Sequence, residues 1–168
     1  MRTLTVYCSL FLLSLLAGCA SAPSSNQPVA AIPGSGSEPS RATRQHIVKI
    51  AESLLGVPYK WGGTTRGGMD CSGVVNYAYN KLGIPVPRTA HDLYFGGQRL
   101  ERVKPGDLLF YKTSPGRISH VGIYVGDGKM IHASTSKRRV IKANINIPYW
   151  RKRWVGGATY LACAGHGC

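Results

Sequence analysis

The hydrophobic pattern of this chain changes its period at Pro105 and Gly106, and this change limits the folds that the chain can adopt. Before it, apolar residues recur every three or four positions around residues 43–55 and 71–82, which is the spacing of amphipathic helices. After it come short segments rich in β-branched and aromatic residues, separated by turn residues: 107–111, 120–125, 130–134, 140–145 and 157–162. This order predicts an α+β domain whose N-terminal helices pack on an antiparallel β-sheet of about five to six strands.

Capping residues indicate where the expected helices begin and end. Asp70 precedes the second helix as an N-cap, because its side chain can accept a hydrogen bond from a free N–H group of the first turn. Thr89 takes the same place before a short third helix that ends near Tyr94. Gly56 and Gly83 can close the first and second helices, respectively.

The N-terminus carries an export signal. Arg2 precedes an apolar run over residues 10–16, which is too short to cross a bilayer as a mature helix. The run ends in Leu-Ala-Gly-Cys, which resembles a bacterial lipoprotein signal in which Cys19 is lipidated and becomes the first residue. An ordinary secretory signal with a cysteine near its cleavage site is the alternative. Ala20 stands where lipoproteins of the inner membrane carry aspartate, so this resemblance implies the outer membrane, facing the periplasm.

The chain divides into four segments by composition. They are the signal peptide (1–18), the lipid anchor and a disordered tether (19–40), one domain (41–162) and a cysteine-containing tail (163–168). The tether has almost no large apolar residue and cannot bury enough surface to fold. Cys163 and Cys168 could form a small disulfide loop in an oxidising periplasm, or remain free or pair between molecules.

The formal net charge of +14 predicts an affinity for polyanions. In an exported lipoprotein nucleic acid is the least available of these, which leaves lipid headgroups and carboxylate-rich polymers. The basic runs at 136–139 and 151–153 are equally consistent with solvated faces. We expect a monomer with no nucleic-acid partner.

Cys71 stands at the first turn of the second expected helix. The helix macrodipole and the unpaired main-chain N–H groups both stabilise a thiolate at this place. Ser72 and Gly73 add little bulk, so a carbonyl group can approach the sulfur and N–H donors can face an oxyanion. A buried structural cysteine is the alternative, and it is the commoner role for a lone cysteine in an apolar helix.

His120 and His132 lie in two consecutive expected strands, and the loop between them decides whether they share a face. A two-residue loop places His132 opposite Ile123, on the other face from His120. A three-residue loop with Gly128 as a left-handed bulge, or an added bulge near Asp127 and Gly128, pairs His132 with Gly122, and both imidazoles then project from one face. Glycine at 128 favours the second arrangement.

Cys71, His120 and His132 together would supply the nucleophile, base and orienting group of acyl transfer. The same three residue types suit zinc, although no fourth ligand is evident. His46, His91 and His166 form no pattern and are expected at the surface.

Six ordered blocks over residues 42–162 resemble the NlpC family of bacterial papain-like cell-wall peptidases: GVPYKWGG, DCSGVVNYAY, GIPVPRTA, VKPGDLLFY, HVGIYVGDGKMIHAS and PYWRKRWVGG. The resemblance implies a papain-like fold in which Cys71 is the nucleophile, His120 the general base and His132 the residue that orients His120. It also implies that three further residues lie beside the oxyanion and the substrate: Tyr59, Ser72 and Arg88. A plain core position is the alternative for the tyrosine.

The resemblance implies a cysteine endopeptidase that cleaves amide bonds of peptidoglycan stem peptides, with no metal or organic cofactor. Stem peptides carry free carboxylates that suit a basic surface. We expect cleavage of the D-Ala-diaminopimelate cross-link, because some lipoprotein relatives with a single catalytic domain cut this bond. The alternatives are the D-glutamyl-diaminopimelate bond within one stem, an amidase or acyltransferase reaction, and an inactive binding protein on the same fold.

Overall fold

The structure is a computed structural model that describes residues 41–161. The predictions for the signal peptide, for Cys19 and the tether, and for the tail with Cys163 and Cys168 lie outside the described residues. Between residues 41 and 161, no helix combines the length and the apolar character that a membrane crossing requires.

The helices of this part of the chain are α1 (Arg41–Glu52), α2 (Cys71–Asn80), α3 (Ala90–Gly96) and α4 (Pro148–Arg151). The strands are β1 (Thr64–Thr65), β2 (Gly68–Met69), β3 (Gln98–Leu100), β4 (Leu108–Tyr111), β5 (His120–Gly126), β6 (Lys129–Ser134), β7 (Arg139–Asn144) and β8 (Trp154–Thr159). The three expected helices and five expected strands are all present. The short hairpin β1–β2, the edge strand β3 and α4 were not predicted.

Within the described residues, six strands form one antiparallel sheet in the order β3-β8-β4-β5-β6-β7. Strands β4 to β7 form a meander, and β8 returns to the other side of β4. The α+β class, with helices packed on an antiparallel sheet, is thereby confirmed. The last strand begins at Trp154, three residues before its predicted start.

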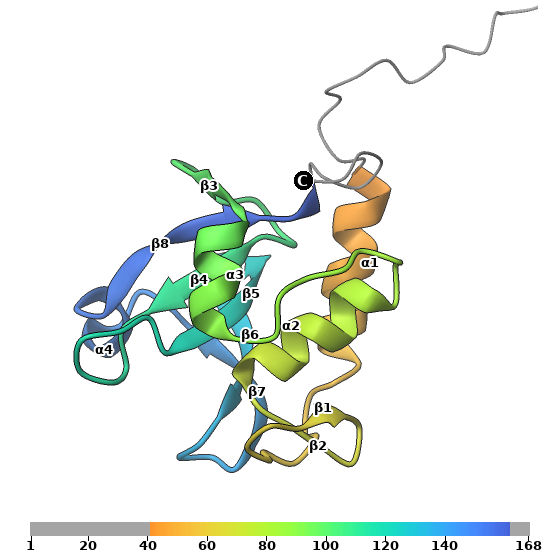
Figure 1. The fold of residues 1–168 in the computed structure, drawn as a ribbon, viewed down its shortest axis with the longest axis horizontal. Helices are drawn as coiled ribbons and strands as arrows, with labels where there is room; N and C mark the ends of the chain where they lie inside the picture. The colour runs from red at the N-terminus through yellow and green to blue at the C-terminus, as the bar shows by residue number, and fades with distance from the viewer. Residues whose placement is uncertain (1–40, 162–168) are drawn as a thin grey trace, which may run out of the picture. The chain divides into compact units, whose positions relative to one another are not determined.

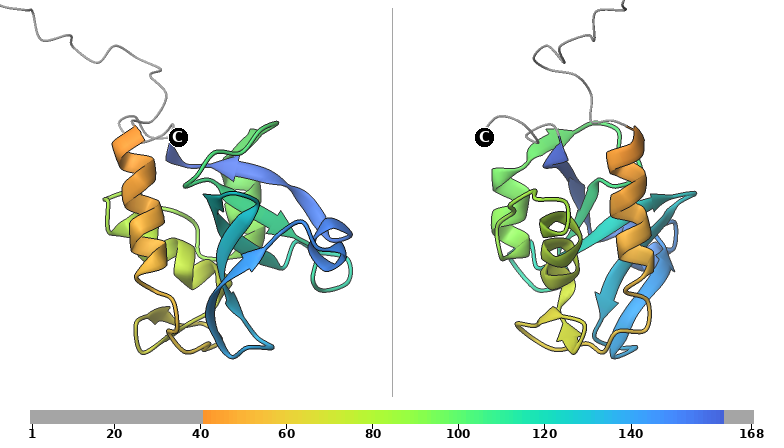
Figure 2. Two further views of the ribbon diagram at one scale, coloured as in Figure 1. Left: turned by 180° about the vertical axis from the view of Figure 1, so that it is seen from behind. Right: turned by 90° about the vertical axis from the view of Figure 1, so that its right-hand side faces the viewer.

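Helices α1, α2 and α3 cover one face of the sheet, with α2 between the other two (Figures 1 and 2). Buried apolar side chains join these layers, among them Ile47 of α1, Val74 of α2, Leu93 of α3 and Val121 of β5. A smaller cluster on the opposite face holds Leu109, Tyr111, Met130 and Trp150 of α4. Alternate residues of β5 therefore face the helices or α4.

Helix α1 ends earlier than predicted, and the residues that follow it pair with β7. The helix stops at Glu52 instead of continuing to residue 55. The main-chain N–H of Gly56 donates to the Val140 carbonyl oxygen at 3.0 Å, and the Val140 N–H donates to the Val57 carbonyl oxygen at 2.8 Å. These bonds give the edge strand β7 a partner. The chain reaches it through turns at residues 53–56, in which the N–H groups of Leu54 and Leu55 bond to carbonyl oxygens three residues back instead of four.

Candidate active site

The start of α2 places Cys71 by a cap and a close contact. Asp70 is the N-cap, as predicted, and its Oδ1 atom accepts a hydrogen bond from the Gly73 N–H at 2.7 Å. A Cβ atom on residue 73 would collide with the carbonyl oxygen of Gly63. Glycine at this position therefore lets the loop before β1 pack directly on the first turn of the helix.

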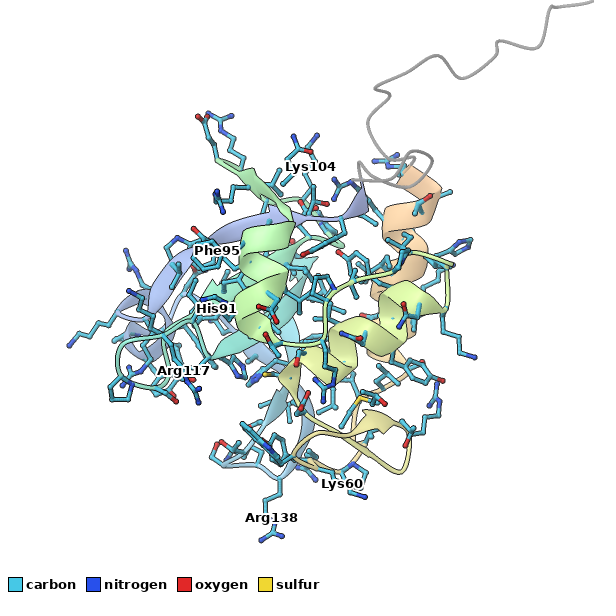
Figure 3. All side chains as sticks on the ribbon, viewed as in Figure 1. Lys60, His91, Phe95, Lys104, Arg117 and Arg138 are labelled. Carbon is cyan, nitrogen blue, oxygen red and sulfur yellow. The ribbon has the colours of Figure 1, made fainter. Side chains whose placement is uncertain are left out.

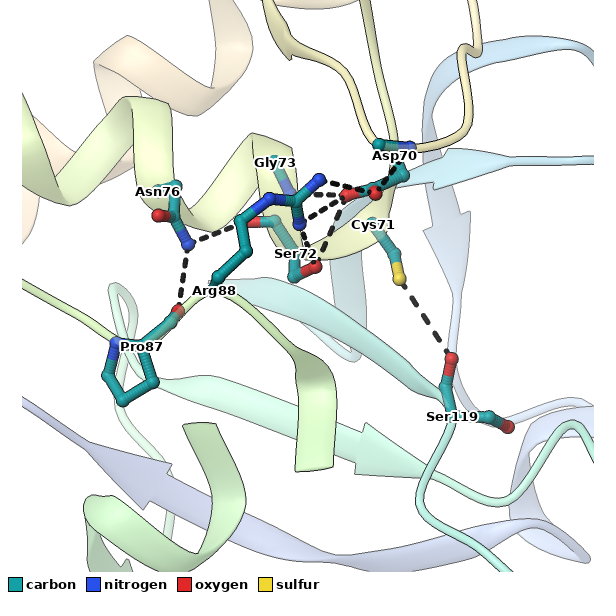
Figure 4. Close-up of polar contacts among 9 residues, drawn as sticks. Asp70, Cys71, Ser72, Gly73, Asn76, Pro87, Arg88 and Ser119 are labelled. Carbon is teal, nitrogen blue, oxygen red and sulfur yellow. Dashed lines mark hydrogen bonds and ion pairs between the residues drawn. The ribbon is translucent and has the colours of Figure 1, made fainter. Parts of the chain in front are cut away.

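The Cys71 thiol points toward the beginning of β5 (Figure 4). Its sulfur lies 4.0 Å from the carbonyl oxygen of Ser119, and the Val121 main chain also contacts it. These two residues flank His120 in sequence. Helix α2 and strand β5, from the two halves of the domain, thus bring the thiol to the strand end that carries the first histidine.

The β5–β6 hairpin places both histidines on one face of the sheet. Ile123 pairs with Ile131, a register that sets His132 opposite Gly122, and the shared face of the histidines is confirmed. Of the two predicted geometries, a three-residue turn or a bulge around Asp127 and Gly128, the structure has the bulge. Asp127 and Gly128 form a two-residue turn, with φ values of 50° and 64°, and the register shifts between residues 124 and 126 of β5. This bulge supplies the extra residue that puts both imidazoles on the same side.

The two imidazoles form a hydrogen-bonded pair in which His132 is buried and His120 is half-buried. Nε2 of His120 lies 2.9 Å from Nδ1 of His132. Trp150 of α4 stacks on the His120 ring at a centroid distance of 5.3 Å and an interplanar angle of 23°, and it meets the His132 ring nearly at a right angle. When Nε2 of His120 donates to His132, Nδ1 of His120 keeps a free lone pair. His132 can therefore orient the His120 ring, and Nδ1 of His120 is free to act as a base.

Burial holds both histidines neutral at pH 7. Burial and the neighbouring His132 lower the pKa of His120 to about 3, and burial lowers the pKa of His132 to about 4. Trp150, which is itself buried, excludes water from one side of this pair. A neutral imidazole is the form that can accept a proton.

The position of Cys71 at a helix start predicts a thiolate, but in the free protein the effects that raise the pKa of its thiol are larger than those that lower it. Burial raises the pKa of the Cys71 thiol, and the charge of Asp70 raises it further, while main-chain hydrogen bonds from Val121, Ser72 and Cys71 itself lower it. The net direction is upward, so the thiol is protonated at neutral pH. The sulfur consequently needs a base before it can act as a nucleophile.

Ser72 and Arg88 lie in a network that braces the start of α2 (Figure 4). The Arg88 Nη2 atom lies 2.7 Å from Oδ2 of Asp70, and its Nη1 atom donates to the Ser72 hydroxyl at 2.7 Å. Asp70 Oδ2 also accepts the N–H of Gly62 at 3.0 Å. The Ser72 side chain is buried in this network, whereas the Arg88 side chain is 40% exposed.

Two hollows meet at Cys71. The arginine hollow, of about 470 Å³, is lined by residues that include Arg88, Arg117 and His91. The imidazole hollow, of about 510 Å³, is lined by residues that include His120, His132 and Tyr59. Both hollows share Trp61, which is 80% exposed, and together they form a continuous site across the sulfur.

A family model described as the NlpC/P60 family matches residues 56–159, which are more than half of the chain. This match spans Cys71, both histidines and the whole hairpin that carries them.

The chain belongs to the NlpC/P60 family.

Named relatives and a solved structure agree with this membership. Murein DD-endopeptidase MepH of Escherichia coli is 39% identical over 123 residues, covering 69% of this chain and 45% of that protein. Gamma-D-glutamyl-L-lysine dipeptidyl-peptidase of Bacillus cereus is 34% identical over 119 residues, covering 68% and 36%. The crystal structure of an NlpC/P60 family protein from Bacillus cereus superposes with a TM-score of 0.67 at 33% identity, covering 70% of this chain and 40% of that one. The chain thus spans less than half the length of these relatives.

In this NlpC/P60 domain, the predicted oxyanion residue Tyr59 lies in the site, and the histidines expected at the surface are exposed where the structure describes them. Tyr59 lines the imidazole hollow, and burial and the nearby Cys71 raise the pKa of its hydroxyl, which stays protonated and can donate. His46 and His91 are exposed, as expected, and His166 lies outside the described residues. Between residues 41 and 161, no three His, Cys, Asp or Glu side chains are grouped to hold a metal ion.

Two residues of the site were missed by reasoning from the sequence. Trp150 covers the imidazole pair, and Trp61 stands between the hollows. Both belong to sequence blocks that carry the family resemblance, PYWRKRWVGG and GVPYKWGG. These blocks contained the tryptophans, but a tryptophan in such a block is equally consistent with a place in the hydrophobic core.

We expect the free energy of unfolding to fall as the pH is lowered from 6.5 toward 3. Histidines of an unfolded chain have a pKa near 6.5, whereas those of the native pair have values of about 3 and about 4. Between these limits the unfolded chain binds more protons, so the stability that is fully present above pH 6.5 is lost on acidification. Urea unfolding at pH 7 and pH 4.5 measures this loss.

The double variant His120→Gln/His132→Asn provides the control, because it lacks both buried imidazoles and keeps the exposed His46 and His91. Its loss of stability between the two pH values should be smaller than that of the wild type. Equal losses would show that the pair is not the source of the acid sensitivity.

Proposed function

We propose that this protein is a cysteine endopeptidase that hydrolyses an amide bond in the stem peptides of peptidoglycan. The observation that carries the proposal is the placement of the Cys71 thiol at the start of β5, beside the hydrogen-bonded pair of His120 and His132. The names of the relatives support the substrate class, since one is a murein DD-endopeptidase and another a gamma-D-glutamyl-L-lysine dipeptidyl-peptidase.

Each step of the reaction has a group in place. Nδ1 of His120 takes the thiol proton as the Cys71 sulfur adds to the amide carbonyl carbon. Main-chain N–H groups at the start of α2 and the Tyr59 hydroxyl face the oxyanion that forms. Collapse of this intermediate breaks the C–N bond, and the leaving amine takes the proton from the His120 imidazolium.

Water completes the turnover. His120, again neutral, accepts a proton from the water molecule that attacks the thioester carbonyl. The C–S bond then breaks, the sulfur regains a proton from His120, and the acyl half leaves as a carboxylic acid. His132 holds the His120 ring through its hydrogen bond in both halves of the reaction. The groups named supply all of the protons that move.

We propose the D-Ala-diaminopimelate cross-link as the bond that is cut. The support is the similarity to MepH, whose name describes a DD-endopeptidase. Cleavage of the D-glutamyl-diaminopimelate bond within one stem is the second candidate, because the similarity to the gamma-D-glutamyl-L-lysine dipeptidyl-peptidase favours it.

Product analysis of purified muropeptides distinguishes these outcomes. The mature protein is incubated with cross-linked dimers and, separately, with disaccharide-tetrapeptide monomers, and the products are identified by mass spectrometry. Cutting the cross-link converts dimers into intact monomers, whereas cutting within a stem shortens the monomers. If neither substrate changes, the peptidase proposal is wrong and a binding role on this fold takes its place.

We further propose that Cys19 is lipidated and anchors the protein to the outer membrane, facing the periplasm. Cells grown with radiolabelled palmitate should label the wild-type protein, and Cys19→Ala should remove the label because it deletes the acyl acceptor. Cys8→Ala is the matched control, since it removes the other cysteine of the N-terminal region and should keep the label. Label retained in Cys19→Ala would refute the anchor.

A further inference from the structure

Only one of the two hollows at Cys71 gives access to the base His120. This difference indicates which half of the substrate binds in each hollow. The leaving amine must take its proton from His120 and therefore has to lie next to that ring. His120 and His132 line the imidazole hollow, and neither lines the arginine hollow. The residue that departs with the amine consequently occupies the imidazole hollow, and the acyl half occupies the arginine hollow.

Among residues 41–161, Lys137 is the only lysine, arginine, aspartate or glutamate that lines the imidazole hollow. Both histidines there are neutral, because burial depresses their pKa values. No aspartate or glutamate of residues 41–161 lines this hollow, and its uncharged polar side chains include the hydroxyl groups of Ser134 and Ser136. Within the described part of the chain, the hollow therefore offers an ammonium group with no carboxylate to neutralise it.

The turn between β6 and β7 holds the main chain of Lys137 in place. Its N–H donates to the Ser134 hydroxyl at 3.2 Å, and the Arg138 N–H donates to the Thr135 carbonyl oxygen at 3.3 Å. Arg138 has a φ of 54°, and its side chain points away from the domain in Figure 3. Of the two basic residues in this turn, only Lys137 lines the site.

The Lys137 side chain is exposed and has no ion-pair partner among residues 41–161. It follows His132 by five residues, and β6 runs directly from that histidine to the turn. The turn that directly follows the strand of the orienting imidazole thus carries the one cation that lines the imidazole hollow among residues 41–161.

We propose that Lys137 binds a free carboxylate on the residue that leaves with the amine, and that it selects substrates whose leaving group is negatively charged. This inference rests on the proposed function and deepens it. Diaminopimelate is the leaving residue in both candidate reactions. In the cross-link, its departing amine and a free carboxylate are attached to the same carbon atom, so an ammonium group near His120 can reach the carboxylate.

The test compares two cross-linked muropeptide dimers that differ only at this carboxylate, which is free in one dimer and converted to an amide in the other. Lys137→Gln should lower kcat/KM for the free carboxylate roughly tenfold or more, because a charge-assisted hydrogen bond is lost. The loss should appear mainly as a higher KM, since the carboxylate is bound in the ground state as well as in the transition state. The amidated dimer should lose less than about twofold.

Lys137→Arg should retain the preference for the free carboxylate. Lys129→Gln is the matched control, because it removes one positive charge from an exposed strand end that lines neither hollow. Equal losses on both dimers in Lys137→Gln would overturn the role of Lys137 and leave the proposed function standing. If the wild type cleaves neither dimer, the proposed function fails and this inference fails with it.

Discussion

Replacing Cys71 by alanine should abolish hydrolysis of muropeptides while the domain remains folded. The thiol is the only group that the mechanism places in covalent contact with the substrate, so its loss should reduce kcat by on the order of 10⁴-fold or more. Cys71→Ser should be nearly as inactive, because a hydroxyl is a far weaker nucleophile than a thiol with the same base. Mass spectrometry of the products over time measures the rate.

The fold should survive because the Cys71 side chain is small and only half-buried. Its loss should change the free energy of unfolding by no more than about 1 kcal/mol. Thermal unfolding followed by circular dichroism checks this point. The double variant Cys163→Ala/Cys168→Ala is the control for thiol loss, because it removes the other two cysteines beyond the N-terminal region and should keep full activity. An active Cys71→Ala protein would show that another group attacks the amide.

Replacing His132 by alanine should lower kcat roughly tenfold to a hundredfold without abolishing activity. His132 positions the His120 ring through the 2.9 Å hydrogen bond and does not itself accept the thiol proton. Without this partner, His120 keeps its contact with Trp150 but can rotate away from the sulfur. Steady-state kinetics on a cross-linked dimer gives the size of the loss.

His132→Asn is the matched variant, because its amide can still hydrogen-bond to Nε2 of His120. It should recover part of the activity that His132→Ala loses, while His120→Ala should be as inactive as Cys71→Ala. Because His132 is only 3% exposed, the melting temperature of each variant must be measured alongside the rate. Unchanged activity in His132→Ala would show that a Cys-His dyad suffices.

The shared face of the two histidines and the need for an odd loop or a bulge could be predicted from the sequence, but the place of the bulge could not. Gly128 favoured a three-residue loop, whereas the structure has a two-residue turn and a bulge between residues 124 and 126. The bulge lies just past the end of the pairing between β4 and β5, where the Tyr124 N–H donates to the Asp107 carbonyl oxygen at 2.8 Å. That boundary depends on a neighbouring strand, which the local pattern does not contain.

The position of Cys71 was predictable from local residues, whereas its protonation was not. Asp70 as N-cap places the cysteine at a helix start, although the helix ends at Asn80 and not next to Gly83 as predicted. The burial that raises its pKa depends on packing against the start of β5, about fifty residues later in the chain. A helix macrodipole is a local property, but desolvation depends on the whole fold.

The ion pair between Arg88 and Asp70 also could not be predicted from local residues. The family resemblance placed it beside the substrate, and it does line the arginine hollow. Its bonds to Asp70 and Ser72 span 18 and 16 residues, and no spacing rule connects these positions. Long-range pairs of this kind become visible only when the loop that carries Arg88 is placed against the start of α2.

In the proposed mechanism, hydrolysis passes through a thioester on Cys71. Hydroxylamine can trap the acyl group of this thioester and so tests the mechanism directly. Hydroxylamine attacks a thioester much faster than it attacks an amide, so it should divert the acyl half of the stem peptide from the acid to the hydroxamate. Turnover of a cross-linked dimer in its presence should therefore yield both acyl products, the acid and the hydroxamate, and Cys71→Ala should form neither. Formation of the acid alone, at every hydroxylamine concentration, would contradict the account.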